Sequence, residues 1–311
     1  MKKIPVWMDC DTGVDDAVAI MLLHALPELA PVGLSAVCGN TTLANTFPNT
    51  HRICRLIGLD VPVYPGAEKP LVRPLNVAAA FHGENGLGDV QLPLPEPYAP
   101  ETTPMWDALF AAAKQHSGEL ELVATGPLTN VAIALTAYPE LRQHLRRILI
   151  MGGAAVGGNV TPAAEFNIYD DPEAAQVVFK SGVPIVMCGL DVTMKAALRP
   201  ADWDELEAFG NAAGRTVKAI LQCSWKNLQR LGLDGVAQHD SCPVMYLAHP
   251  EFFSGRPAGV FVETQSELTR GKTVTDLFSD KKFGVQNALV LLDVDREAFI
   301  AELKARIKTL C

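Results

Sequence analysis

Short apolar runs alternate with longer helical patterns up to about residue 200. The runs are rich in Val, Ile and Leu and short enough for buried strands, whereas the segments between them repeat apolar residues at helical spacing. This alternation is typical of βαβ units on a mainly parallel sheet. The predicted strands are residues 4–8, 32–38, 61–64, 120–124, 148–151 and 185–188, and the predicted helices are residues 15–26, 43–57, 106–116, 128–137 and 172–179.

The pattern changes after Pro200. It predicts helical structure over 203–231, a helix from about Ser241, strands over 260–264 and 288–293, and a terminal helix over 296–310. The Pro- and Gly-rich stretch 65–104 is a long irregular region, which makes it a candidate active-site lid. No repeat or linker interrupts the chain, so the sequence predicts a single α/β domain over 1–311, with an open, mostly parallel sheet flanked by helices.

Polar residues follow the predicted strands. Asp9-Cys10-Asp11 ends the first, and later strands end in Gly39-Asn40, Thr125-Gly126, Gly152-Gly153 and Asp191-Val192-Thr193. Open α/β sheets bind ligands outside the carboxyl ends of their strands. The sequence therefore predicts an active site at that edge, in one polar crevice with several carboxylates.

Composition and charge disfavour several classes of partner for this protein. The 311 residues are 49% hydrophobic and 20% charged, and the net charge of −9 comes without any basic block, which disfavours a nucleic-acid partner. The apolar start is too short for a signal peptide, and the run 17–23 is too short to span a membrane, so we expect a cytoplasmic protein without a membrane partner. Seven cysteines without CxxC spacing predict reduced, buried thiols.

Four carboxylates fall within eight residues at the first strand end: Asp9, Asp11, Asp15 and Asp16, with Gly13 at the turn. Carboxylates this close repel one another unless a cation or hydrogen-bond donors compensate. Oxygen ligands without a Cys/His cage favour Ca²⁺ or Mg²⁺ over zinc. In the alternative, Asp15 and Asp16 only complement the helix dipole while Asp9 caps a turn, which leaves Asp11 unexplained.

A DxD motif after a strand also suggests a phosphatase with an aspartate nucleophile. That chemistry expects Thr or Val two places after the second Asp, where this chain has Gly13. The chain also lacks a GxxxxGK[ST] loop, and Asp15-Asp16 would repel a phosphate. A phosphorylated substrate is therefore disfavoured.

Two later segments carry further polar candidates. The loop 158–167 contains Asn159, Glu165 and Asn167, and such groups suit a polyhydroxyl ligand such as a sugar, although an ordinary connecting loop has a similar composition. His239-Asp240 opens a late helix, where the alternative is a surface histidine beside an N-cap.

Together these motifs resemble the nucleoside hydrolases, also called inosine-uridine-preferring or ribonucleoside hydrolases. The matching segments run in family order along nearly the whole chain: residues 9–17, Gly39-Asn40, His82-Gly83-Glu84, residues 125–130, Met151-Gly152-Gly153, residues 158–167, residues 171–175, residues 189–193 and His239-Asp240.

The resemblance implies a tightly bound Ca²⁺, a nucleoside substrate and a homodimeric or homotetrameric assembly. It implies that calcium is held by Asp11, Asp16, the Thr125 carbonyl and Asp240. It implies ribose binding by Asp15, Asn40, Asn159, Glu165 and Asn167. Asp11 would also be the base that deprotonates the attacking water, and His239 and His82 would face the nucleobase, His239 being the expected acid.

The chemistry of the bond agrees with these roles. Cleaving an N-glycosidic bond develops positive charge on the ribose, which carboxylates and amides stabilise, and the departing base needs a proton donor such as histidine. The function expected is calcium-dependent ribonucleoside hydrolysis in nucleoside salvage. The alternative is a non-catalytic nucleoside- or sugar-binding protein, which would not need Asp11, Asp16, Asp240 and His239 together.

The chain departs from the family pattern in two places, one at the acidic turn and one in the helix before His239. Thr12 stands where Pro is usual, and Trp225, Asn227 and Leu231 stand in a neighbourhood where many members carry Tyr or Gln. Leu offers less hydrogen bonding than those residues, so the sequence leaves the preferred base open.

Overall fold

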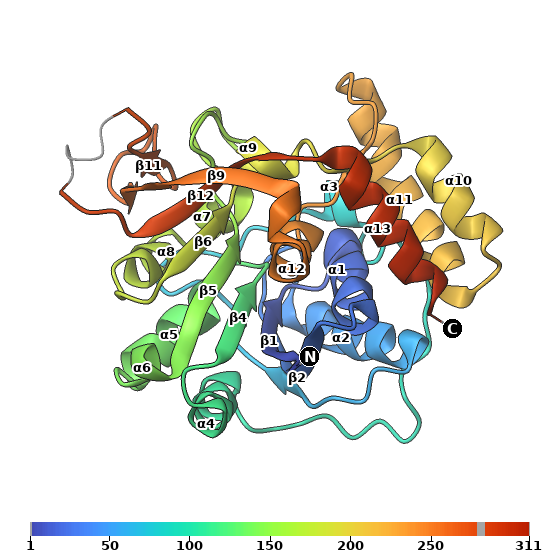
Figure 1. The fold of residues 1–311 in the computed structure, drawn as a ribbon, viewed down its shortest axis with the longest axis horizontal. Helices are drawn as coiled ribbons and strands as arrows, with labels where there is room; N and C mark the ends of the chain where they lie inside the picture. The colour runs from blue at the N-terminus through green and yellow to red at the C-terminus, as the bar shows by residue number, and fades with distance from the viewer. Residues whose placement is uncertain (1, 279–283, 311) are drawn as a thin grey trace.

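An eight-stranded sheet forms the centre of the molecule in the computed structural model, which describes residues 2–278 and 284–310. The strand order is β3-β2-β1-β4-β5-β6-β12-β9, and every neighbouring pair is parallel except β12 and β9 (Figure 1). The strands are β1 (Ile4–Cys10), β2 (Leu29–Ala36), β3 (Val63–Pro65), β4 (Leu120–Ala124), β5 (Leu145–Met151), β6 (Ile185–Cys188), β9 (Phe253–Ala258) and β12 (Ala288–Val294). The predicted α/β class and mostly parallel sheet are confirmed.

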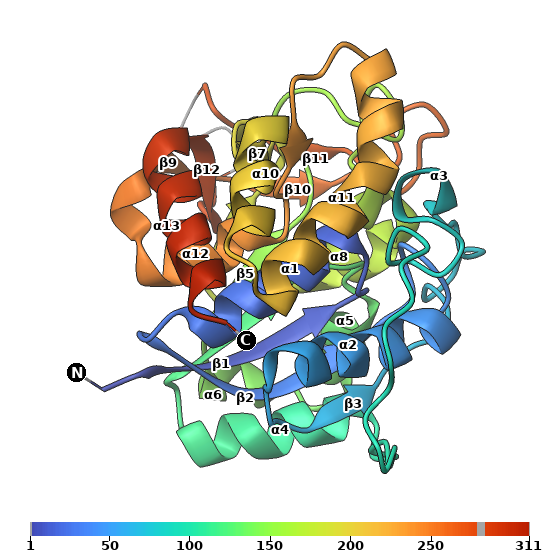
Figure 2. The same ribbon diagram turned by 90° about the vertical axis from the view of Figure 1, so that its right-hand side faces the viewer.

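Helices cover both faces of this sheet (Figures 1 and 2). They are α1 (Val14–Ala25), α2 (Leu43–Ile57), α3 (Ala79–His82), α4 (Met105–His116), α5 (Thr129–Ala137), α6 (Leu141–His144), α7 (Phe166–Asp170), α8 (Pro172–Phe179), α9 (Leu190–Thr193), α10 (Pro200–Ala208), α11 (Ala212–Arg230), α12 (Ser241–Ala248) and α13 (Arg296–Lys308). Strand β1 serves both faces, since Val6 and Met8 join the core with α1, α11 and α13, whereas Trp7 joins the core with α4, α5 and α8.

The order in which strands are added to the sheet changes direction between β1 and β4. Strands β2 and β3 extend the sheet on one side of β1, and β4, β5 and β6 extend it on the other. Such a switch point leaves a crevice beyond the carboxyl ends of the strands. Asp11 and Thr125 follow the two adjacent strands there, and Thr125 N donates to Asp9 O over 2.9 Å.

Two predictions about the last third of the chain need correction, and one strand there was not predicted. Residues 203–231 form two helices, because the chain breaks at Gly210, whose φ of +74° favours glycine. The predicted strand 260–264 is β10 (Val260–Val262), which pairs with β11 (Thr273–Thr275) outside the main sheet. The antiparallel edge strand is β9, whose exposed Ser-Gly-Arg-Pro sequence lacks strand patterning and which forms by backbone pairing with β12.

The irregular region 65–104 contains the short helix α3. No helix within the described residues is long and apolar enough to cross a membrane. Six cysteines are free thiols, and Cys223 in α11 is partly exposed rather than buried as predicted. Cys311 lies outside the described residues.

Candidate active site

The acidic turn between β1 and α1 lies at the bottom of a cavity. Asp11 Oδ2 accepts from the Asn40 backbone N–H over 2.6 Å. Asp16 Oδ2 accepts from Gly13 N over 2.9 Å and from Asn40 Nδ2 over 3.1 Å, and its Oδ1 accepts from Thr125 Oγ1 over 2.8 Å. The ends of β1, β2 and β4 therefore supply the donors that hold these two carboxylates.

Three acidic residues could hold a metal ion together. Asp15, Asp16 and Asp240 are all buried, and one carboxylate oxygen from each lies within 4.8 Å of the others. Asp240, which opens α12 far along the chain, was expected beside Asp16 from the family resemblance alone, and Asp15 was expected to bind ribose instead. Asp11 lies outside the group, and the ligand set Asp11, Asp16, Thr125 and Asp240 stays a prediction.

The expected four-carboxylate cluster is wrong in one respect, because Asp9 does not belong to it. Asp9 Oδ1 accepts from Ser35 Oγ over 2.6 Å and from Asn130 Nδ2 over 2.8 Å. Ser35 lies in β2 and Asn130 lies in α5, so the Asp9 carboxylate lies among the side chains of these two elements. Its role is to join these elements beneath the site.

Burial and mutual repulsion disfavour negative charge on Asp11, Asp15 and Asp240. Burial, and then repulsion from Asp16, raises the pKa of Asp11 well above its ordinary value and that of Asp15 to about 7. Burial and the charges of Asp15 and Asp16 likewise raise the pKa of Asp240. Asp11 Oδ1 and Asp15 Oδ1 are buried and have no hydrogen-bond partner within the described residues. Buried carboxylate oxygens that lack hydrogen-bond donors would be stabilised by a hard divalent cation.

A cavity of about 540 Å³ opens above this turn. A pocket of this size accommodates a small ligand. Asp11 and Asp16 are fully buried and do not line it. The remaining predicted site residues all line it: Asp15, Asn40, His82, Thr125, Asn159, Glu165, Asn167, His239 and Asp240.

The polar residues of the loop 158–167 have both structural and ligand-facing atoms. Glu165 accepts from the backbone N–H groups of Gly153, Asn167 and Ile168, so it caps α7 and fixes the β5 end. Burial raises its pKa to about 7, although these donors oppose the rise. Asn167 Nδ2 donates to Thr125 O over 2.7 Å, which leaves that carbonyl one further lone pair. Asn159 Oδ1 accepts from Phe166 N over 3.0 Å, and its amide nitrogen remains to donate.

Two histidines line the cavity. His82 Nδ1 accepts from the Val14 backbone N–H over 3.2 Å, and His239 Nδ1 lies 2.7 Å from Thr193 Oγ1. Burial lowers the pKa of both rings to about 4, and in His82 the nearness of His239 adds to the effect. Both rings are therefore neutral at pH 7 when the pocket is empty.

Apolar residues also line the cavity, and most of them were missed from the sequence because no motif marks them. Leu228 and Leu231 line it together with Phe81, Val160, Met194 and Val236. Trp225 and Asn227 are absent from the lining: Trp225 packs edge-to-face on Trp203, and Asn227 Nδ2 donates to Ala80 O over 2.6 Å. Ser224, which does line the cavity, donates to Phe81 O over 2.6 Å.

Comparison with known proteins gives a consistent result. Residues 6–301 match the family model described as inosine-uridine preferring nucleoside hydrolase. The chain is 42% identical over 310 residues to the pyrimidine-specific ribonucleoside hydrolases RihA of Shigella boydii and of Escherichia coli K12, with 98% of each chain covered. It superposes on a purine-preferring ribonucleoside hydrolase from Gardnerella vaginalis with a TM-score of 0.91 and 31% identity, with 98% of each chain covered.

Proposed function

Because the chain belongs to the inosine-uridine preferring nucleoside hydrolase family, we propose that it hydrolyses ribonucleosides to a free base and ribose with calcium at the acidic turn. Its curated relatives are ribonucleoside hydrolases, and the chain is accordingly an N-ribosyl hydrolase. The observation that carries the finer proposal is that one cavity is lined both by acidic and amide side chains, which include Asp15 on the β1–α1 turn at its floor, and by apolar side chains. That combination matches a ligand made of a sugar and a base.

The residues of the floor fit a divalent cation. The donor set consists of oxygens alone, and Asp11 Oδ1 and Asp15 Oδ1 are buried without partners within the described residues. We assign Asp11, Asp16, Asp240 and the Thr125 carbonyl to the cation. When bound there, calcium would supply Lewis-acid activation of water and offset the repulsion among the carboxylates.

The ribose is proposed to lie between Asp15 and the loop 158–167. Asn40 Nδ2 is occupied by Asp16, so its Oδ1 is free to accept from a sugar hydroxyl, whereas Asn159 presents its amide nitrogen as a donor. A sugar hydroxyl needs both kinds of partner. The carboxylates of Asp15 and Glu165 would stabilise positive charge that develops on the ribose ring as the bond breaks.

Proton transfers are assigned to two residues. Asp11 would take a proton from the attacking water at Oδ1, while the bond from Asn40 N holds Oδ2 in place. His239 would give a proton to the departing base, since negative charge on that base favours the protonated ring. His82 would hydrogen-bond to the base from Nε2, because its Nδ1 already accepts from Val14 N.

The assembly and the role in salvage rest on the family resemblance. We propose a homodimer or homotetramer, a cytoplasmic location and a role in nucleoside salvage.

A nucleoside panel tests the proposal. Ribose release would be measured as reducing sugar from cytidine, uridine, inosine, adenosine and guanosine, after exhaustive chelation and again after calcium is added. We expect turnover that chelation abolishes and calcium restores. Binding of nucleosides without ribose release would instead favour the non-catalytic alternative, and full activity in protein shown by elemental analysis to be metal-free would refute the cation.

The same panel should include uridine 5′-monophosphate. The described lining of the cavity holds the carboxylates of Asp15, Glu165, Asp234 and Asp240 and no Lys or Arg, so a phosphate would be repelled. We expect kcat/KM for the nucleotide to be at least tenfold below that for uridine, roughly the effect of one unfavourable charge contact. Comparable values would mean that the substrate class is wrong.

A further inference from the structure

A small antiparallel ribbon carries His239 and Asp240 into the cavity. Strand β7 (Ala197–Leu198) pairs with β8 (Val236–Ala237), and the two site residues follow β8 directly. Gln238 N donates to Ala196 O over 2.9 Å, which extends the pairing to the edge of the site. The ribbon is two residues long on each strand, and so short a two-stranded pair has little stability of its own.

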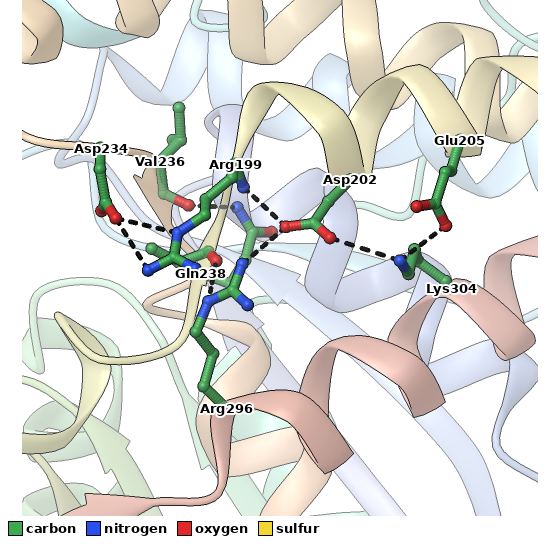
Figure 3. Close-up of polar contacts among 9 residues, drawn as sticks. Arg199, Asp202, Glu205, Asp234, Val236, Gln238, Arg296 and Lys304 are labelled. Atoms are coloured by element: carbon green, nitrogen blue, oxygen red, sulfur yellow. Dashed lines mark hydrogen bonds and ion pairs between the residues drawn. The ribbon is translucent and has the colours of Figure 1, made fainter.

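Arg296, in the first turn of α13, holds this ribbon from behind (Figure 3). Its Nε donates to Ala197 O over 3.0 Å, and its Nη2 donates to Asp202 Oδ2 over 2.6 Å. One planar guanidinium therefore bridges a backbone carbonyl of β7 and a carboxylate of α10. The Arg296 side chain is 23% exposed, so water competes only in part for these contacts.

Asp202 is itself fixed on several sides. It accepts from the Arg199 backbone N–H over 2.9 Å, and Lys304 Nζ lies 3.3 Å from its Oδ1. Burial by itself would raise the pKa of Asp202. The two donors and the charge of Arg296 outweigh burial and lower this pKa below its ordinary value. The carboxylate is thus ionised at neutral pH and joins Arg296 and Lys304 of α13 to α10.

A second branch of the network reaches the cavity wall. Arg199 Nε donates to Asp234 Oδ2 over 2.9 Å, and Asp234 lines the cavity just before β8. Both pair members are about half or more exposed, so this contact contributes less than the Arg296 bridge. Figure 3 shows the two branches meeting around Asp202, with Val236 and Gln238 beside them.

We infer that Arg296 is a positioning residue for the reaction: by bridging Asp202 and the Ala197 carbonyl, it fixes the β7–β8 ribbon and so the ring of His239. The partner of that ring, Thr193, lies in α9 just before the same ribbon, so both ends of the hydrogen bond move with β7 and β8. This inference rests on the proposed role of His239 as acid for the departing base. Arg296 does not line the cavity and touches no proposed substrate group.

Substrates with different leaving groups distinguish a positioning role for Arg296 from a general loss of structure. The p-nitrophenolate of a p-nitrophenyl riboside leaves as an anion without a proton, whereas the base of a nucleoside needs the acid. With calcium at a saturating concentration, which favours the cation-bound position of Asp240, Arg296→Ala should lower kcat on nucleosides by about tenfold to 10²-fold, as expected for a misplaced catalytic group. It should lower kcat on the p-nitrophenyl riboside less than about threefold. Arg296→Lys keeps the charge but lacks the two-donor fork, so it should show a smaller loss with the same preference.

Arg73 provides a matched control. Its Nη2 lies 2.6 Å from Glu173 Oε1 and 3.0 Å from the Thr264 carbonyl oxygen, and its side chain is 25% exposed, yet it lies away from the cavity lining. Arg73→Ala should therefore remove a bridge of the same kind and leave the ratio of rates on the two substrates unchanged.

Hydrogen exchange gives a readout that does not depend on activity. Arg296→Ala should speed amide exchange in peptides spanning 195–198 and 236–240, whereas Arg73→Ala should not. Equal slowing of both substrates, or unchanged exchange in these peptides, would overturn the inference. If the wild-type protein releases no ribose, the proposed function fails, while the exchange comparison still decides whether Arg296 holds the ribbon. Should Arg296→Ala not fold, the same two measurements on Arg296→Lys decide the matter.

Discussion

His82 and His239 face one cavity, but their Nδ1 atoms have different partners. The Val14 backbone N–H can only donate, so a hydrogen on His82 Nδ1 would break that bond and bring two N–H groups together. The Thr193 hydroxyl can donate or accept, so His239 can gain or lose a proton without losing its partner. This difference favours His239 over His82 as the acid in the proposed reaction.

The separate roles of Asp11 and His239 can be measured with two leaving groups. His239→Ala should lose about 10²- to 10⁴-fold in kcat on inosine, the usual range for one general acid, yet keep most activity on p-nitrophenyl riboside. Asp11→Ala should lose activity on both, because every substrate needs the attacking water. Initial rates of base and p-nitrophenol release check this.

One outcome of this experiment would exclude His239 as the acid. Equal slowing of both substrates would mean that His239 is not the acid, and His82→Ala would then be tested in the same way. His51→Ala serves as the control, since His51 packs between Phe47 and Tyr98 outside the cavity lining.

Among the elements, the strand-to-loop transition after β2 has little tolerance for a side chain. A Cβ at Gly39 would lie 2.2 Å from Asp11 Oδ2 and 2.6 Å from Pro127 Cδ. The backbone fixes the position of an alanine Cβ, so either Asp11 or the backbone must move to relieve these contacts. Glycine here is therefore required by the close approach of the β2 end to the carboxylate.

Gly39→Ala should accordingly displace Asp11 and lower kcat by about 10²-fold on both nucleosides and p-nitrophenyl riboside, the effect of an ångström-scale misplacement. Steady-state kinetics check the loss, and calorimetric titration with calcium checks whether the cation still binds. Gly182→Ala is the control: its Cβ meets nothing within 4 Å, but its φ of +84° strains alanine. It should cost stability without changing kcat, and a wild-type kcat in Gly39→Ala would contradict the argument.

The molecule as a whole buries several acidic side chains in its centre. The pKa values of Asp9 and Glu165, like that of Asp15, are raised to about 7, with burial as the largest cause in each case. A carboxyl group with a higher pKa in the folded than in the unfolded chain binds more protons when folded. Raising the pH from about 4 to about 7 removes those protons and favours unfolding.

Metal-free protein should therefore lose thermal stability as the pH rises. Between pH 5 and pH 8 in the presence of a chelator, we expect Tm to fall by on the order of 5 °C or more. Calcium should reduce this fall, because a bound cation compensates the ionised carboxylates. Differential scanning fluorimetry over this pH range measures both series, and a Tm that is flat or rises with pH in the chelator series would contradict the prediction.

Much of the fold could be predicted from the sequence, because local patterning reports burial. The helix 43–57 and the strands 120–124 and 185–188 lie where predicted, since each carries its own apolar periodicity and end signals. Strand β9 could not be predicted, because it is held by backbone pairing with β12 rather than by its side chains. The break at Gly210 was missed because both flanking segments have helical patterns.

The sequence by itself determined the types of group at the site, since polar residues after buried strands must gather at one edge of a parallel sheet. Only the tertiary structure decided which groups meet. It brought Asp240 to Asp15 and Asp16 and turned Asp9 toward Ser35 and Asn130. It also placed Arg296 behind the ribbon that carries His239. The partners of these carboxylates and of Arg296 depend on how the helices and strands pack. The pattern of apolar and polar residues along the chain indicates which side chains are buried, but not which residue of another element each one contacts.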